Sequence, residues 1–228
     1  MIDQEWLDRA QEDGGCVSHL ELLHAQLTGQ DWSELEVRTS SFQGCTFTDC
    51  DFSGTAFYDC GFSGCCFSGC RLPSAFFQDC RITGSKLDGA DLRRARLRRC
   101  TLEDTLARYA NWNAAVLDQC TLKDCDLTES ALSECRLSKL NFDSVDLTGA
   151  ELFKTSFRGL DLSRCTLDNV ALSASCAELK GAVISAQQAT VVARVLGIRV
   201  VPCKKGALLW SPTITGRWTR LPRLPITP

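Results

Sequence analysis

The chain has 228 residues, a formal net charge of −3 and only two histidines. Its length allows one or two domains, and no run of apolar residues approaches the length that spans a membrane. The first residues, Met1-Ile2-Asp3-Gln4-Glu5, lack the basic and apolar regions of a signal peptide. These features argue against a secreted or membrane protein and favour a cytoplasmic one.

The N-terminal residues predict a short helix that ends by about Gly15. Asp3 is placed to cap it, Trp6 and Leu7 begin an apolar stripe, and Gly14 stops it. Because terminal units of repeat proteins are usually atypical caps, we expect residues 1–20 to cover one end of a larger structure.

A repeat of five residues dominates the chain from Leu22 to Ala177. Every fifth residue is a large apolar one except Ala107 and Ala177, and the residue two places before it is usually small. This period fits neither a helix nor a strand and is typical of a solenoid. Four sides of five residues would close one coil in about 20 residues, and coils would stack about 4.8 Å apart. The central residues that we expect to form the core include Phe42, Phe47, Phe52, Phe57, Phe62, Phe67, Phe77, Leu92, Trp112, Leu127 and Leu147.

Cysteine is frequent at the small position of the repeat. The chain has fifteen cysteines, and those in the repeat include a column formed by Cys60, Cys80, Cys100 and Cys120. A reduced cysteine acts as a compact buried hydrophobe, and we favour this role over disulfides. The spacing of five and the absence of nearby histidines do not fit a zinc site, so we predict no metal and no cofactor.

The repeat resembles the pentapeptide-repeat family, whose motif is A(D/N)LXX. The match is almost literal at Ala90-Asp91-Leu92 and at Ala150-Glu151-Leu152. This resemblance implies an all-β fold over residues 21–178, a right-handed quadrilateral parallel β-helix with a helical N-terminal cap and a C-terminal helix and strand. The repeat weakens at Leu106–Tyr109, where we favour an underfilled column beside Trp112 over a bulge or bend.

Charge is distributed unevenly along the repeat. Five arginines lie between Arg93 and Arg99, all at outward positions, and carboxylates predominate after them. The arginines could hold phosphate or carboxylate groups of a partner, but we favour pairing with neighbours such as Asp88, Asp91, Glu103 and Asp104. The tail after Pro202 carries five cations and no acid, so the remainder of the chain sums to −8. An acidic body discourages nucleic-acid binding and suits partners that themselves bind nucleic acid.

The residues after Leu172 follow a different pattern. Ser185 and Gln188 form a capping-box pattern, a helix ends at Gly197, and residues 198–201 predict a short strand. We expect residues 179–202 to cover the end of the solenoid and to mediate dimerisation through Val191, Val192, Val195, Leu196 and Ile198. Residues 203–228 form a basic tail in which Pro212, Pro222, Pro225 and Pro228 oppose regular strand pairing.

The segment from Leu179 to Val200 resembles the C-terminal end of Qnr- and MfpA-type quinolone-resistance proteins. That resemblance implies two solenoids paired end to end and a surface that binds DNA gyrase in place of DNA. The repeat frame shows no inserted loop between Leu22 and Ala177, so the chain is more similar to the loop-free members of that group.

No catalytic arrangement is recognisable, because neither His19 nor His24 has a nucleophile or an orienting acid at a known spacing. We therefore expect a binding protein and not an enzyme. The leading hypothesis is a dimeric DNA mimic that protects gyrase or another topoisomerase from a drug or toxin, with Asp143, Asp146 and Glu151 as contacts. The alternative is a scaffold or effector that binds another protein through a solenoid face, which would require residues such as Arg93, Arg94 and Arg98.

Overall fold

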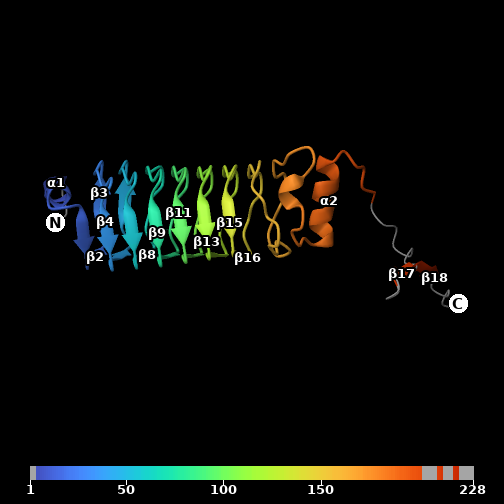
Figure 1. The fold of residues 1–228 in the computed structure, drawn as a ribbon, viewed down its shortest axis with the longest axis horizontal. Helices are drawn as coiled ribbons and strands as arrows, with labels where there is room; N and C mark the ends of the chain where they lie inside the picture. Colours follow the sequence, from blue (N-terminus) through green and yellow to red (C-terminus); the bar gives the residue numbers. More distant parts are fainter. Residues whose placement is uncertain (1–3, 202–209, 213–217, 221–228) are drawn as a thin grey trace.

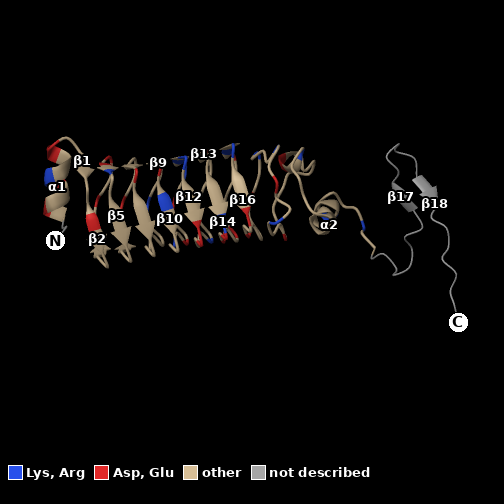
Figure 2. Ribbon diagram, turned by 90° about the horizontal axis from the view of Figure 1, so that it is seen from below, with Lys and Arg blue, Asp and Glu red and all other residues tan. Residues whose placement is uncertain are grey.

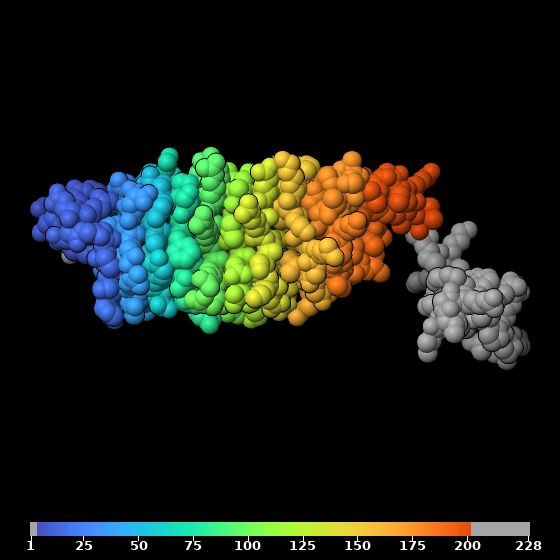
Figure 3. Space-filling view, viewed as in Figure 1, coloured from blue at the N-terminus to red at the C-terminus, as the bar shows by residue number. Residues whose placement is uncertain are grey.

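The computed structural model describes residues 4–201, 210–212 and 218–220. Most of these residues form one elongated parallel β-solenoid (Figure 1), which confirms the fold class expected from the repeat. Helix α1 (Gln4–Glu12) lies at one end of the rod and helix α2 (Ala186–Val195) at the other. The space-filling view shows the coils as successive packed bands between these two ends (Figure 3).

Each coil has four sides, and paired residues of neighbouring coils are twenty positions apart along most of the rod. We number the sides 1 to 4 in chain order, by the central residues Val17, Leu22, Leu27 and Trp32 of the first coil. Side 1 consists of the parallel strands β1 (Cys16–Ser18), β4 (Glu36–Arg38), β7 (Ala56–Tyr58), β9 (Phe76–Gln78), β11 (Arg96–Arg98), β13 (Val116–Asp118) and β15 (Arg136–Ser138). Side 2 consists of β2 (Glu21–Leu23), β5 (Ser41–Gln43), β8 (Gly61–Ser63), β10 (Arg81–Thr83), β12 (Thr101–Glu103), β14 (Thr121–Lys123) and β16 (Asn141–Asp143).

Sides 3 and 4 turn more tightly and are joined mainly by single bridges. On side 3, β3 (Gln26–Thr28) pairs with β6 (Thr46–Thr48), and isolated bridges continue the ladder as far as Thr166. Side 4 runs through bridges from Asp31 to Ala171. The backbone hydrogen bonds of neighbouring coils are therefore satisfied within the stack, as a parallel sheet requires.

The central residues fill the interior as stacked columns. Phenylalanine rings one coil apart stack with their centroids 4.9 Å apart for Phe42 and Phe62 and 4.6 Å apart for Phe47 and Phe67. These separations match the step between paired strands, about 4.8 Å. All the core residues named from the sequence are buried, with exposed fractions of 4% or less.

The small inward residues fill the space between the central residues and also form hydrogen bonds. The Cys60 thiol donates to the Val37 carbonyl at 3.4 Å, and the Thr55 hydroxyl donates to the Trp32 carbonyl at 2.8 Å. Cysteine, serine and threonine can alternate at this position because each is compact and each satisfies a buried carbonyl. The fourteen cysteines among the described residues are free thiols, and burial raises the pKa of Cys70 to about 12.

The weak repeat at Leu106 introduces no bulge. Leu106 bridges Lys86 and Asp126 in the regular register, and the Ala107 side chain is buried. The alternative of a bulge at this repeat is therefore wrong.

The ladder is interrupted on two sides near the C-terminal end. No backbone hydrogen bond in the described part of the chain joins β15 or β16 to the next coil, although sides 3 and 4 remain paired there. Leu140 and Leu160 occupy successive small positions at this level and are only partly buried. We attribute the interruption to these two leucines, because they need more room than the thiols that fill the preceding coils.

The repeat frame ends earlier than the sequence indicates. Asp161 bridges Val183, twenty-two positions later, and the Phe157 amide donates to the Glu178 carbonyl, so Ala177 is not a central residue. The residues from 177 to 179 form a short 3-10 helix, η1 (Ala177–Leu179). At the other end the first coil begins at β1, before residue 21, where we expected the solenoid to start.

Helix α2 is fixed to the last coil by one glutamine. Ser185 and Gln188 form the expected capping box, and the Gln188 side-chain amide also donates to the carbonyls of Leu162 and Cys165 at 2.7 and 2.6 Å. This buried side chain therefore both begins the helix and attaches it to the solenoid.

Two expectations about the C-terminal region are wrong. Residues 198–201 form no strand, because the Ile198 amide returns to the Ala193 carbonyl beyond the left-handed Gly197 (φ 73°) and no partner strand lies beside them in the described part of the chain. In the tail, β17 (Trp210–Pro212) pairs antiparallel with β18 (Trp218–Arg220), which the proline content did not indicate. Asp3, the expected cap of α1, and most of the tail lie outside the described residues.

Candidate functional site: an acidic edge and a basic face

The twenty-residue register turns sequence spacing into surface columns. The outward side chains of each side stack one above another, one coil apart. Residues that are twenty, forty or sixty positions apart therefore share a column, whereas residues five apart lie on different sides. Charged residues that look scattered in the sequence collect into two separate surfaces.

Five carboxylates gather at the corner between sides 2 and 3, and we call them the acidic edge. On side 2, Asp143 ends β16, and on side 3, Asp126 and Asp146 bridge each other. Figure 2 shows acidic residues along the lower rim of the coils near β12, β14 and β16. The acidic edge consists of Asp104, Asp124, Asp126, Asp143 and Asp146.

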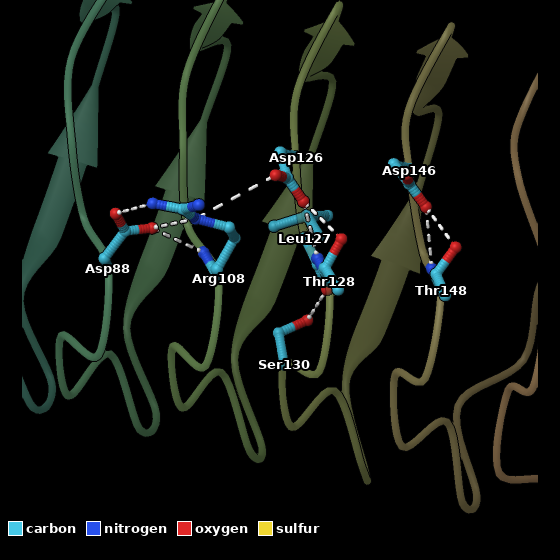
Figure 4. Close-up of polar contacts among 8 residues, drawn as sticks. All are labelled: Asp88, Arg108, Asp126, Leu127, Thr128, Ser130, Asp146 and Thr148. Atoms are coloured by element: carbon cyan, nitrogen blue, oxygen red, sulfur yellow. Dashed lines mark hydrogen bonds and ion pairs between the residues drawn. The ribbon is translucent and has the colours of Figure 1, made fainter.

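Local hydrogen bonds orient the side chains of Asp126 and Asp146. Asp126 accepts from the backbone amide and the hydroxyl of Thr128, at 2.9 and 2.5 Å, and Asp146 accepts from Thr148 in the same way, at 2.9 and 2.6 Å (Figure 4). In each case one carboxylate oxygen receives both bonds, which leaves the other oxygen for a further contact. In the next turn, the Ser130 hydroxyl donates to the Leu127 carbonyl.

The cations closest to the acidic edge are already paired. Arg108 forms two hydrogen bonds with Asp88, at 2.8 and 3.1 Å, and reaches Asp126 only at 3.9 Å (Figure 4). The hydrogen bonds from Arg108 lower the pKa of Asp88. Arg164 neutralises Asp143 at 2.8 Å. In the described part of the chain, Asp104 and Asp146 have no cation within ion-pair distance, so the edge keeps a negative charge.

Cations gather on side 1, which lies opposite side 3. Arg96 and Arg136 share one column on β11 and β15, and Arg98 lies on the same strand as Arg96. We call the set Arg96, Arg98, Arg136, Lys139 and Arg158 the basic face. None of its members has a carboxylate within 4 Å among the described residues, and Asp118 is the acid that lies between them on β13.

Two further arginines of the central cluster, Arg93 and Arg99, are paired, whereas Arg94 has no carboxylate within 4 Å among the described residues. Arg93 binds Asp91 with two hydrogen bonds of 2.8 and 2.7 Å, and Arg99 binds Asp79 on the preceding coil at 2.6 and 2.5 Å. The hydrogen bonds from Arg99, with a smaller effect of the charge on Arg98, lower the pKa of Asp79. The expected pairing is therefore correct for Asp91 and Asp88, but Glu103 pairs with Lys123, and Asp104 has no arginine partner.

The partner-binding residues named from the sequence do not form one site. Asp143 and Asp146 lie together at the acidic edge, but Glu151 lies on side 4. Arg93 and Arg94 also belong to side 4, and only Arg98 belongs to the basic face. Five further members of the two surfaces were not predicted from the sequence: Asp124, Asp126, Arg136, Lys139 and Arg158. A search at intervals of twenty would have found them.

The C-terminal end of the rod presents an apolar surface. Of the residues expected to mediate dimerisation, Val191 and Val192 are half-buried against the last coil, whereas Val195, Leu196 and Ile198 are 38%, 47% and 55% exposed. We call the exposed set the apolar end: Val183, Val195, Leu196, Ile198, Val200 and Val201.

The described residues contain no group of three or more histidine, cysteine or acidic side chains that could hold a metal ion. Nor do they contain a helix long and apolar enough to cross a bilayer.

A family model described as "Pentapeptide repeat region" matches residues 40–106, 55–121 and 106–172, which together span more than half of the chain. No curated protein sequence matches the chain.

Several solved structures are similar in fold. The plasmid-mediated fluoroquinolone resistance protein QnrB1 is 20% identical, with a TM-score of 0.37 over 81% of this chain and 100% of that one. HetL, a protein involved in heterocyst differentiation regulation in Nostoc, is 19% identical, with a TM-score of 0.38 over 81% and 98%. A pentapeptide-repeat protein of the Arabidopsis thaliana thylakoid lumen is 20% identical, with a TM-score of 0.40 over 43% and 67%. At these identities the likeness concerns the fold alone.

Proposed function

The chain belongs to the pentapeptide-repeat family, and from this membership we propose that it binds DNA gyrase or a related topoisomerase through its acidic edge. Binding would occupy the surface where that enzyme holds DNA and would protect the enzyme from a drug or toxin that acts on its DNA complex. In this role the protein is a rigid binding partner and carries out no chemical reaction.

The acidic edge is the observation that carries this proposal. Asp126 and Asp146 are held in place by Thr128 and Thr148, so their carboxylates need little further ordering when a partner binds. The two residues lie one coil step apart, about 4.8 Å, on side 3, where the backbone is paired from coil to coil. A regular line of negative charge on a stiff support is the feature of DNA that a basic enzyme channel recognises.

The C-terminal segment gives independent support. Its sequence from Leu179 to Val200 resembles the end of Qnr- and MfpA-type proteins, and its helix is fixed to the solenoid by Gln188. We propose that the apolar end pairs two chains, which would place two acidic edges on one longer rod. The exposure of six apolar residues at this end fits a surface that a second chain covers.

Direct binding of the purified protein to purified gyrase tests the proposal. The test variant is Asp104→Asn/Asp124→Asn/Asp146→Asn, which removes three charges from the acidic edge and keeps side-chain size. The matched control is Glu21→Gln/Asp31→Asn/Asp49→Asn, which removes three exposed charges near the N-terminal end of the rod.

We expect the edge variant to bind gyrase about tenfold more weakly than the native protein at physiological salt, because exposed charge contacts each contribute modestly. The control should bind like the native protein, and DNA should compete with both. Equal weakening in the two variants would show that only net charge matters. Absence of binding by the native protein would overturn the proposal.

The basic face favours a second candidate function. A scaffold that holds another protein on side 1 would use a surface that the gyrase proposal leaves unoccupied, because a DNA mimic presents acidic and not basic groups to its target. A protein that binds its partner only through side 1 would be unaffected by the edge variant and would not require gyrase.

A further inference from the structure

We propose that the basic face on side 1 is a docking surface for a short, carboxylate-rich segment of a partner protein. The surface is distinct from the acidic edge, and the inference does not depend on gyrase binding. Four observations support it: these cations lack ion-pair partners, the coils set their spacing, aromatic side chains adjoin them, and the acidic edge lies on other sides of the rod.

The cations of the basic face are available for a partner. Of the eleven Lys and Arg residues on sides 1 to 4 that precede Arg136 in the described chain, most have a carboxylate within 4 Å, as Arg93 and Arg99 do. Arg96, Arg98, Arg136, Lys139 and Arg158 have none within the described ranges. Their side chains are exposed, so a bound carboxylate would replace water and would break no existing ion pair.

The solenoid sets the spacing of these groups. Arg96 and Arg136 lie in one column two coils apart, with Val116 between them, which places their backbones about 10 Å apart. Arg98 lies on the same strand as Arg96, and Arg158 lies in the coil that follows β15. Four of the five groups are guanidinium groups, whose planar forks suit paired hydrogen bonds to carboxylates. The surface can therefore contact several acidic side chains of one extended segment.

An aromatic surface adjoins the basic face. Phe76 precedes Arg96 in its column, and its ring lies 5.5 Å from that of Tyr58 in an edge-to-face arrangement. The Arg38 guanidinium covers the Tyr58 ring at 4.4 Å. Both rings are only partly buried, so an apolar side chain beside the acidic residues of a partner would have a surface to pack against.

The charge of the whole rod favours a short polypeptide over nucleic acid. The protein has a net charge of −3, and the acidic edge lies at the far side of side 2, which adjoins side 1. A long polyanion would extend beyond the basic face and meet those carboxylates, whereas a segment of a few residues stays within it. At physiological salt the screening length is about 8 Å, so the basic face acts locally on such a segment.

Fluorescence anisotropy tests the proposal with two labelled probes, a ten-residue glutamate peptide and a ten-nucleotide thymidine strand. The test variant is Arg96→Gln/Arg136→Gln/Lys139→Gln. The matched control is Lys86→Gln/Lys180→Gln/Arg194→Gln, which removes three equally unpaired cations elsewhere on the described surface. Circular dichroism establishes that both variants keep the fold.

We expect the peptide to bind the native protein and the control alike, and to bind the test variant about tenfold more weakly. Binding should weaken as salt increases. A nucleotide strand that binds more tightly than the peptide, with the same loss in the test variant, would overturn the choice of partner. The proposed site would be wrong if peptide binding weakened equally in the test variant and the control. It would also be wrong if neither probe bound the native protein. This assay contains no gyrase, so a negative result here does not bear on the proposal that the protein binds gyrase.

Discussion

At the scale of the residue, the cysteines show how one position in the repeat decides chemical behaviour. A thiol two places before a central residue is enclosed by the stack and donates to a backbone carbonyl, as Cys60 does. Burial raises the pKa of Cys65 to about 11 and that of Cys70 to about 12. Cys16 and Cys66 lie at outward positions instead and are exposed and partly exposed.

This difference predicts which thiols react. With Cys203 replaced by serine, because it lies outside the described residues, a thiol reagent should modify only Cys16 and Cys66 in the folded protein. The other twelve cysteines should react only after unfolding, since a buried thiol cannot meet the reagent. Mass spectrometry of the labelled protein gives the count. Rapid labelling of Cys70 or Cys100 in the native state would contradict the packing described above.

The repeat frame predicts which residues are buried but not which charges pair. Centres such as Phe42 and Leu92 follow from the period of five alone, because the period fixes the inward direction. The ion pair between Arg99 and Asp79 joins two coils, and it could be found only by comparing positions twenty apart. Asp79 is not among the neighbours of Arg99 along the chain, so this partner was not predicted.

At the scale of the element, the two ends of the rod differ. Helix α1 covers one end with the fully buried Leu7. Helix α2 covers the other, and most exposed residues of the apolar end lie at its C-terminus and in the residues after it. A cap that only shields the core would have a polar outer face, which is why we propose that the apolar end pairs with a second chain.

We therefore expect the protein to be a dimer that depends on the apolar end. The variant Leu196→Asp/Ile198→Asp should elute with the mass of one chain in light-scattering chromatography, because charges would be buried in the interface. The control Leu23→Asp/Tyr109→Asp changes two apolar residues that are as exposed, at 67% and 68%, but lie away from this end. The control should remain a dimer. A native protein with the mass of one chain, or a dimeric Leu196→Asp/Ile198→Asp variant, would contradict this expectation.

Local sequence patterns predicted α2 well and the residues after it poorly. The pair Ser185 and Gln188 is a local signal, and both of its hydrogen bonds form. The strand at residues 198–201 was predicted from β-branched residues alone. Such residues fit well in a sheet, but they do not show that a partner strand is present. The end of the five-residue frame near Glu178 was not predictable from local sequence either. We attribute it to the buried Glu178 carboxylate, which accepts hydrogen bonds from the backbone amides of Lys154 and Ser173.

At the scale of the whole molecule, the rod is polarised across its width. Side 1 carries the basic face, and the corner of sides 2 and 3 carries the acidic edge (Figure 2). The overall charge of −3 hides this division, which only the coil geometry shows. Two partners of opposite charge could therefore bind the same rod without competing.

The supercoiling of relaxed DNA by gyrase, measured with a fluoroquinolone present while this protein is titrated, tests the central claim most directly. We predict that the native protein restores supercoiling, that the acidic-edge variant Asp104→Asn/Asp124→Asn/Asp146→Asn does not, and that Arg96→Gln/Arg136→Gln/Lys139→Gln still does. Inhibition without rescue would mean that the protein competes with DNA but does not protect. No effect of the native protein at any concentration would contradict the proposed function and leave the docking surface on side 1 as the basis for a scaffold.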